Sequence, residues 1–257
     1  AELDLVLRRQ LDVDALDAVA VLAHARQRDH HVLVDLEGVG VARDRRGLAA
    51  LEPEALALLG SDHPLEAWLR CCDPGRDVLL DGRSAAEDGS SQWISGPESR
   101  AESHFRRSEV DAILVGTGTA IEDDPELTAR KPDGSYYENQ PLRVVLGESE
   151  LSKDLRIFND KAQTLELKTR SIHGALAELW ARGIKHVWVE GGPKVASKFE
   201  KLGLVDEYII YLAPMLIGGE RTSLRNIGVE SIKDAHKLKF VETKMLGEDI
   251  FIRARRS

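Results

Sequence analysis

The chain has 257 residues and a formal net charge of −9 at pH 7. This length allows one large domain, or one domain with an extension, around a substantial core. The acidic balance argues against nucleic acid or an anionic membrane as the main partner. The sequence contains neither an apolar run near the roughly 18 residues of a membrane span nor a signal-peptide pattern, so we expect a soluble, cytoplasmic protein.

The sequence gives no sign of a metal centre or a disulfide framework. Its two cysteines, Cys71 and Cys72, are adjacent and therefore lack metal-ligand spacing. His24 and the pair His30-His31 have no carboxylate or cysteine at ligand spacing, so no metal is expected. No serine stands in a nucleophile elbow, which argues against a Ser-His-Asp hydrolase.

The first part of the chain differs in composition from the rest. Every lysine lies at Lys131 or later, while the early region uses only arginine as its long cation. Periodicity there predicts helices over about 13–28 and 53–59 and a short strand over about 31–36. The sequence Asp73-Pro74-Gly75 is typical of a turn and predicts a boundary. We therefore expect an N-terminal α/β extension of uncertain role over 1–76 and a main domain over 77–257.

From residue 77 onward, apolar runs of strand length alternate with helical patterns. Strands are predicted over 110–116, 142–147, 184–190 and 205–214, with the near-continuous apolar character of strands covered on both faces. Helices are predicted over 171–183, over 193–203, and from Pro97 onward. The two segments around Gly247 alternate at period two and predict a terminal β-hairpin. This order indicates an α/β domain with a mixed sheet flanked by helices.

The stretch VEGGPK, Val189 to Lys194, lies between a predicted strand and a predicted helix. Free N–H groups and the positive end of the helix dipole favour a phosphate at such a helix start. Pro193 removes no intrahelical hydrogen bond in the first turn. An ordinary strand-to-helix turn explains the same residues equally well.

The stretch VGTGTAIEDDPELTAR, residues 115–130, continues from the end of another predicted strand. Two hydroxyls, Thr117 and Thr119, stand on slender backbone there and could line a polyol or a nicotinamide edge. Asp123 and Asp124 follow, and Arg130 ends the stretch. The alternative is a solvated loop in which one aspartate caps a turn.

A third stretch, residues 81–107, begins with the tight turn Asp81-Gly82-Arg83. Trp93 in a polar setting could stack on a planar ring, or could instead pack onto the following helix as a hydrophobic staple. Ser91 could bond a sugar hydroxyl or a phosphate. The pair Arg106-Arg107 is most simply a solvated helix face.

Together these stretches resemble a known family. DGRSA, SQWIS, DAILVGTGTAIEDDPELTAR, QPLRVVLG and VWVEGGPKVASKFEKLGLVDEYIIYLAPMLIGGE are similar to the reductase domain of the bifunctional deaminase–reductase of bacterial riboflavin biosynthesis. The similarity runs in order and spacing over about 78–257. It implies a dihydrofolate-reductase-like fold, NADPH as hydride donor, and reduction of the ribosyl group of 5-amino-6-(5-phosphoribosylamino)uracil to a ribityl chain.

The resemblance also assigns roles to residues of this chain. Asp123 and Glu190 are the expected catalytic residues, orienting the ribose and helping to deliver the proton that accompanies hydride. The residues expected to line NADPH are Trp93, Thr119, Asp123, Gly191, Gly192, Pro193 and Lys194. The residues expected to meet the substrate are Ser91, Arg107, Leu127, Arg130 and Glu190, with the arginines as phosphate partners.

The chain departs from the family pattern in three places. Pro74 and Gly75 stand where the family's first strand should run, and Glu148 follows the RVVL strand where it would disfavour a 2′-phosphate. Residues 1–76 lack the His-x-Glu and Pro-Cys-x-x-Cys motifs of a zinc deaminase, so deaminase activity is not expected.

Two other functions stay open: a reductase of another pterin- or pyrimidine-like compound, and a non-catalytic NADPH-binding or assembly subunit of the same fold. Retained arginines favour a phosphorylated substrate, and NADPH binding without turnover would indicate the non-catalytic subunit. The family commonly pairs through this domain, so a homodimer is expected. The apolar terminal hairpin would supply an edge that needs protection.

Overall fold

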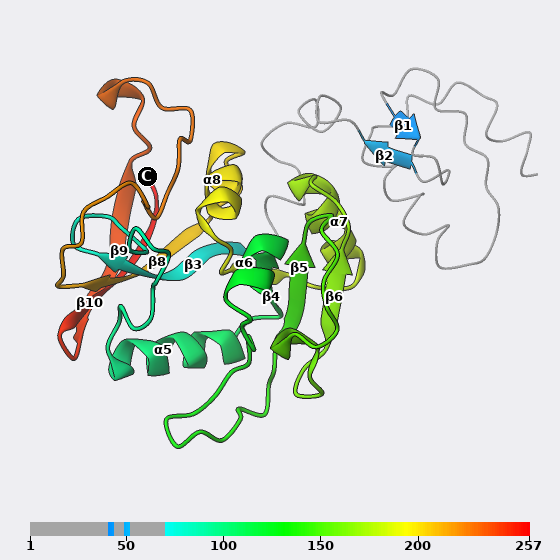
Figure 1. Cartoon of the computed structure of the whole chain (residues 1–257). Coiled ribbons are helices and arrows are strands. Elements are labelled where there is room, and N and C mark those ends of the chain that lie inside the picture. The colour runs from blue at the N-terminus through cyan, green and yellow to red at the C-terminus, as the bar shows by residue number, and fades with distance from the viewer. Residues whose placement is uncertain (1–40, 44–48, 52–69) are drawn as a thin grey trace, which may run out of the picture. The chain divides into compact units, whose positions relative to one another are not determined.

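The computed structural model describes residues 41–43, 49–51 and 70–257, and the predicted elements over 13–28, 31–36 and 53–59 lie outside them (Figure 1). The chain divides into two compact units, Ala1–Pro64 and Leu65–Ser257. In the first unit, β1 (Val41–Arg43) pairs with β2 (Ala49–Leu51) in an antiparallel ribbon.

The second unit is built on an eight-stranded mixed sheet with the strand order β6-β5-β4-β7-β3-β8-β10-β9 (Figure 1). The strands from β6 to β8 in this order are parallel, and β10 runs antiparallel to both β8 and β9. The predicted mixed sheet and terminal hairpin are confirmed. The strand bounds are β3 Arg70–Leu79, β4 Ala112–Gly116, β5 Leu142–Leu146, β6 Thr164–Leu167, β7 His186–Val189, β8 Glu207–Ala213, β9 Leu238–Leu246 and β10 Asp249–Arg256.

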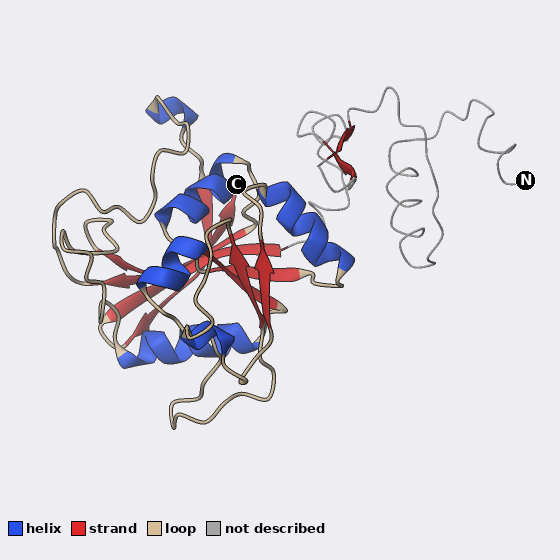
Figure 2. Cartoon of the chain, turned by 45° about the vertical axis from the view of Figure 1, so that its right-hand side comes forward, coloured by secondary structure: helices blue, strands red, loops and turns tan. Residues whose placement is uncertain are grey.

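Helices lie on both sides of the sheet (Figure 2). Their ends follow the predicted capping signals. Ser171 accepts a hydrogen bond from the N–H of Gly174 at 3.1 Å, and Gly183 and Gly203 have φ of +82° and +74° after their helices. Within the described part of the chain, no helix is both long enough and apolar enough to cross a membrane. The bounds are α5 Pro97–Ser108, α6 Thr117–Glu122, α7 Ile172–Ala181 and α8 Pro193–Lys201, with short 3-10 helices at Arg156–Phe158 and Ile232–Asp234.

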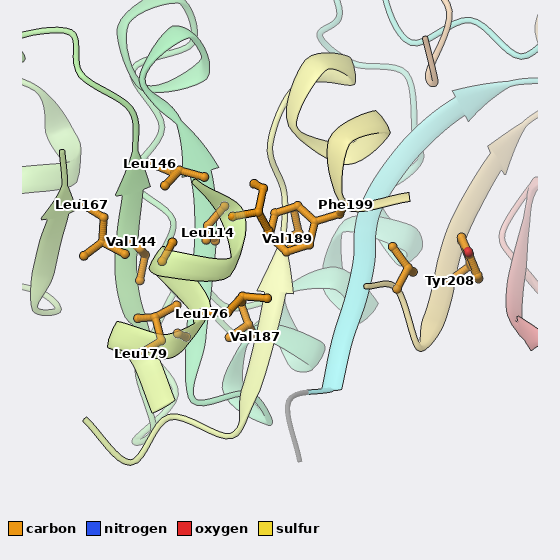
Figure 3. Packing of buried hydrophobic residues seen from close by; sticks show 14 of the residues in the cluster. Leu114, Val144, Leu146, Leu167, Leu176, Leu179, Val187, Val189, Phe199 and Tyr208 are labelled. Atoms are coloured by element: carbon orange, nitrogen blue, oxygen red, sulfur yellow. The ribbon is translucent and has the colours of Figure 1, made fainter. Parts of the chain in front are cut away.

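The core has two layers because both faces of the central strands are covered. Leu114 of β4 packs with α7 and with Phe199 of α8, and Figure 3 shows this layer. The alternate residues Ile113 and Val115 pack on the other face with Ala120 of α6. All five residues of β4 are buried, which explains why the run reads as continuously apolar rather than alternating.

The predicted turn at Asp73-Pro74-Gly75 is wrong. These residues lie in β3, between β7 and β8, and β3 begins at Arg70, before the expected boundary at 76/77. The pairing of β3 with β8 shifts register between Asp73 and Arg76. A bulge of this kind lets a proline occupy a central strand without breaking the rest of the ladder.

Two further elements do not appear among the predictions. The Gly-Thr run after β4 forms the short helix α6 rather than a loop. Strand β6 is a four-residue edge strand with three half-buried residues. A short, partly polar strand carries too little periodicity to be recognised.

Candidate active site at the ends of strands β4 and β7

Strands β4 and β7 are parallel neighbours, and the chain leaves them toward opposite edges of the sheet. After β4 the chain proceeds to β5 on one side of the pair, and after β7 it proceeds to β8 on the other. Ligands of open α/β sheets bind at such a switch point, beyond the carboxyl ends of the strands. The stretches at the ends of these two strands, Gly116–Thr119 and Glu190–Lys194, belong to two of the three stretches that the sequence singled out.

A hydrogen bond joins the two stretches. The Gly192 N–H donates to Thr119 Oγ1 at 3.1 Å, so α6 and the start of α8 are held together. A Cβ on Gly191 would lie 2.7 Å from Val195 Cβ, and one on Gly116 would lie 2.9 Å from Val195 Cγ2. These two glycines are therefore required by the packing of Val195, whatever ligand the site takes.

The start of α8 presents positive charge. Gly192 is the N-cap and makes no side-chain capping bond, Pro193 occupies the first turn, and Lys194 is exposed beside it. Lys198, which the sequence grouped with the first turns, lies in the last turn of α8. The helix dipole and Lys194 favour an anionic group at the start of the helix.

Glu190 and Arg107 form a bidentate ion pair. The Arg107 Nε and Nη2 donate to the two Glu190 carboxylate oxygens at 2.7 Å each, and both side chains are mostly buried, with 16% and 12% of their surface exposed. Arg107 Nη1 donates to the Thr128 carbonyl at 3.2 Å. Both ends of the Arg107 guanidinium are therefore hydrogen-bonded within the protein. The sequence had suggested instead that Arg107 lies on a solvated helix face or binds a phosphate.

A second polar group, absent from the sequence predictions, lies across β3, β8 and β10. Asp77, Tyr211 and Phe251 are in register on these three strands. Burial, reinforced by Asp249 and Glu190, raises the pKa of the Asp77 carboxyl. The Tyr211 hydroxyl is buried without a hydrogen-bond partner among the described residues, and burial raises its pKa too.

Asp249 ties this group to α5. Its Oδ2 accepts from the Gly96 N–H at 2.8 Å and from Ser99 Oγ at 2.6 Å. The Asp249 carboxylate on β10 therefore accepts hydrogen bonds at the N-terminus of α5, where the N-cap residue Gly96 has no side chain to do so. In the sequence, this group is indicated only by a charged residue within each of two strand patterns, Asp77 and Asp249. The strand register is needed to show that both residues face α5.

The stretch from Asp123 to Arg130 carries two left-handed residues, Asp124 with φ +39° and Leu127 with φ +51°. Leu127 is buried in the core layer under α6. Asp123 ends α6, where its N–H donates to the Thr119 carbonyl at 3.0 Å. Its side chain is exposed, and partial desolvation together with neighbouring Glu122 raises its pKa.

Arg130 is held by Glu126. The Arg130 Nη1 lies 3.2 Å from Glu126 Oε2, and Arg156 Nη2 lies 3.3 Å from the same oxygen. Burial alone would raise the pKa of the Glu126 carboxyl, but the Tyr136 hydrogen bond and the two arginines lower it. About a third of the Arg130 side chain, 35%, remains exposed.

Ser91 and Trp93 lie on the loop that leads into α5. Both are exposed, Trp93 to 72%, and the guanidinium carbon of Arg100 lies 4.7 Å from the centroid of the Trp93 ring. They border α5 rather than packing into the core. No group of histidine, cysteine and carboxylate side chains within the described residues could hold a metal ion.

Comparison with known proteins shows the family to which the chain belongs. A model of the RibD C-terminal domain matches residues 78–252. A riboflavin biosynthesis protein RibD of Mycobacterium tuberculosis is 43% identical over 196 residues, covering 74% of this chain and 57% of that protein. A 2,5-diamino-6-ribosylamino-4(3H)-pyrimidinone 5′-phosphate reductase of Methanothermobacter thermautotrophicus is 34% identical over 202 residues, covering 68% of this chain and 93% of that protein.

A solved structure agrees. The diaminohydroxyphosphoribosylaminopyrimidine deaminase/5-amino-6-(5-phosphoribosylamino)uracil reductase of Thermotoga maritima superposes with a TM-score of 0.65 at 26% identity, covering 75% of this chain and 58% of that one. The chain spans little more than half the length of such RibD relatives. The family model covers most of the second unit, from β3 to β10, and this chain belongs to the RibD C-terminal domain family.

Proposed function

We propose that this chain reduces the ribosyl group of 5-amino-6-(5-phosphoribosylamino)uracil to the ribityl chain, with NADPH as the reductant, in riboflavin biosynthesis. The observation that carries the proposal is the carboxylate of Glu190, held by Arg107 at the carboxyl end of β7 beside the start of α8. The names of the archaeal and Thermotoga relatives support the same substrate class.

The residues present fit an anionic dinucleotide. The start of α8, with no side-chain cap and with exposed Lys194, suits a diphosphate, and Thr119 stands beside it through its bond to Gly192. Glu148, which would repel a 2′-phosphate, is paired with Arg170 at 2.9 Å. This pairing supports NADPH, because the local carboxylate charge is offset. Trp93, on the loop before α5, is the proposed aromatic contact.

On the substrate side, the roles differ between the two arginines. Arg107 is hydrogen-bonded to Glu190 and Thr128, so we assign it to hold the Glu190 carboxylate in a fixed orientation. Arg130 keeps exposed surface and is the better phosphate partner. Ser91 completes the proposed substrate contacts, and Leu127, whose side chain is buried, would contribute only through its backbone.

The chemistry requires an open ribose ring, so that C1′ accepts hydride while a proton is taken up by the substrate. When bound, NADPH supplies that hydride. The Glu190 carboxylate accepts hydrogen bonds from ribose hydroxyls and orients them. The pKa of the Asp123 carboxyl is raised toward neutral pH, which suits this group to hold and deliver a proton.

The test is NADPH oxidation followed by loss of its absorbance, with the substrate generated in place by a separate deaminase. Glu190→Gln and Arg130→Ala should each lower kcat/KM by about a hundredfold or more, because each removes a charged contact to the reacting or bound substrate. Arg182→Ala on α7, where the arginine pairs with Glu178 away from the site, is the matched control and should retain turnover. Turnover that survives the first two substitutions would contradict the assigned site.

The second candidate is a non-catalytic NADPH-binding or assembly subunit. It is favoured by the irregularity of β3, which contains Pro74 and a register shift at the centre of the sheet. In addition, the half-buried Asp77 carboxyl is near enough to Glu190 for their negative charges to interact. NADPH binding in a titration without any turnover of the pyrimidine would establish this function instead.

We also propose a homodimer formed through the terminal hairpin. Strand β9 is the last strand of the sheet, and it exposes Phe240 to 67% and Met245 to 62%. Ile250, the register partner of Met245 on β10, is exposed to 37%. An apolar edge strand of this kind is usually covered by another chain.

A further inference from the structure

Two residues of the proposed substrate side, Leu127 and Arg130, flank a short piece of backbone that side chains grip from two directions. The gripped residues are Thr128 and Ala129, both buried. Side chains of α5 hold the first, and a side chain from the loop before β5 holds the second. We call these contacts the 128–129 clamp.

The α5 arm of the clamp is His104, assisted by Arg107. His104 Nδ1 lies 2.9 Å from the Thr128 carbonyl oxygen, which also accepts from Arg107 Nη1 at 3.2 Å. A carbonyl oxygen only accepts, so the short contact requires the proton on Nδ1. The Arg130 N–H also points to Nδ1, at 3.3 Å, and Arg107 Nη1 lies 3.5 Å from it. We assign the proton to Nδ1 from the shorter contact with Thr128, and with this tautomer neither of the two longer contacts is a hydrogen bond.

The ring is neutral in this setting. Burial first, and then the charges of Arg107 and Arg130, lower the pKa of His104 to about 4. At neutral pH the imidazole therefore offers a single Nδ1–H in a fixed direction, set by its contact with Thr128.

The second arm is Gln140. Its Oε1 accepts from the Ala129 N–H at 2.9 Å, and its Nε2 donates to the Ala129 carbonyl at 2.8 Å. The same Nε2 donates to the Tyr137 carbonyl at 2.8 Å. The Ala129 carbonyl also accepts from the Tyr137 N–H at 3.1 Å, so the Gln140 amide supplements a backbone contact at the carbonyl and is the partner of the Ala129 N–H.

The clamp holds backbone that is costly to fold this way. Leu127, immediately before Thr128, is a bulky residue with φ +51°. A non-glycine residue in the left-handed region costs about 1–3 kcal/mol and persists only where its surroundings over-determine it. Such sites concentrate where side chains must be presented to a ligand.

We propose that His104 and Gln140 are positioning residues, which fix Thr128 and Ala129 so that the Leu127 backbone and the Arg130 side chain face the phosphorylated substrate. This inference rests on the proposed function for its ligand. The Arg130 guanidinium reaches its partner Glu126 at 3.2 Å from this fixed backbone. Without the clamp contacts, the backbone of Thr128 and Ala129 is no longer fixed, and the Arg130 side chain loses its defined orientation toward the substrate.

The kinetic test compares His104→Leu, which removes the donor, with His104→Asn, which keeps an N–H near the position of Nδ1. Gln140→Met tests the other arm, and His173→Leu on α7 repeats the first substitution away from the clamp. His104→Leu and Gln140→Met should raise KM for the phosphorylated pyrimidine about tenfold and change KM for NADPH less than about twofold. His104→Asn should recover most of the loss, and His173→Leu should match the parent.

Amide hydrogen exchange gives a readout that needs no turnover. Both clamp variants should speed exchange in the peptide spanning 127–137, which contains the Ala129 N–H, and leave the core strands protected. Equal changes in both KM values, no rescue by Asn, or unchanged exchange in 127–137 would overturn the clamp. An inactive parent protein with the expected exchange pattern would overturn the proposed function and leave the clamp standing.

Discussion

Glu190 and Arg107 act as one charged unit, because each is mostly buried and each satisfies the other. Glu190→Gln or Arg107→Gln alone leaves a buried charge without its partner, and should lower the free energy of unfolding by about 3 kcal/mol. The double variant removes both charges and should recover much of that loss. Urea unfolding at neutral pH measures all three, and equal stability of the single variants and the parent would contradict the pairing.

His104 should leave its mark on the pH dependence of stability. Its folded pKa of about 4 lies below the ordinary value of 6.5, so the unfolded chain binds more protons between these two values. Stability from this residue is fully present above pH 6.5 and is lost as the pH falls toward 4. Arg107 and Arg130 oppose the protonated ring, while Glu126 favours it.

The measurement is urea unfolding of the parent and of His104→Asn across pH 4 to 7. Allowing for the partial exposure of the ring, the parent should gain about 1–2 kcal/mol more than the variant over this range. Parallel stability curves for the two proteins would show that His104 keeps an ordinary pKa.

The sequence singled out some residues of the candidate site but not the side chains that hold them. Glu190, Thr119 and Gly192 could be found because they follow apolar runs and carry distinctive residue types. Arg107 stands 83 residues before Glu190, and nothing in a run of helical charges indicates which one turns inward. The grouping of Asp77 with Tyr211 depends on strand register, which one sequence does not specify.

At the scale of elements, Val195 of α8 packs against two glycines, Gly116 at the end of β4 and Gly191 after β7, and neither position has room for a side chain. Gly191→Ala would bring a new Cβ to 2.7 Å from Val195 Cβ and should destabilise the protein by about 1–3 kcal/mol. Val195→Ala in the same chain removes the obstructing methyl groups and should restore part of that stability. Urea unfolding of the two single variants and the double variant checks this, and additive losses would contradict the steric cause.

Helix α5 shows why an element can be predicted while its role is missed. Pro97 marks its start correctly, but its inward contacts are polar: Ser99 to Asp249, His104 to Thr128 and Arg107 to Glu190. Helix recognition relies on an apolar stripe that faces the core. A helix that covers a site with hydrogen-bonding side chains has no such stripe, so its start can be read from the sequence while the direction that its side chains face cannot.

At the scale of the whole molecule, the proposed dimer has a direct test. Phe240→Asp with Met245→Asp places charge on side chains that are already exposed, so the monomer fold should be retained. Sedimentation equilibrium should give twice the chain mass for the parent and one chain mass for the variant, because a buried carboxylate at the interface is costly. A parent protein of one chain mass would refute the proposal.

The architecture was accessible to sequence analysis to the extent that its strands are buried on both faces. Strands β4, β5, β7 and β8 and the hairpin have runs long enough to recognise. Strand β3 was missed because Pro74 and Gly75 are ordinarily turn residues, and only pairing with strands more than a hundred positions later in the chain makes them a strand.

That pairing has a consequence for the order of assembly during synthesis. The ribosome releases β3 first of the strands in this sheet, yet both neighbours of β3 lie within 186–213. The block β6-β5-β4-β7 contains no strand from before Ala112 and can form while β3 waits without a partner. Strand β3 then docks beside β7, and β8 closes over it. The charged group around Asp77 and Glu190 is consequently enclosed only after the emerging chain has passed β8.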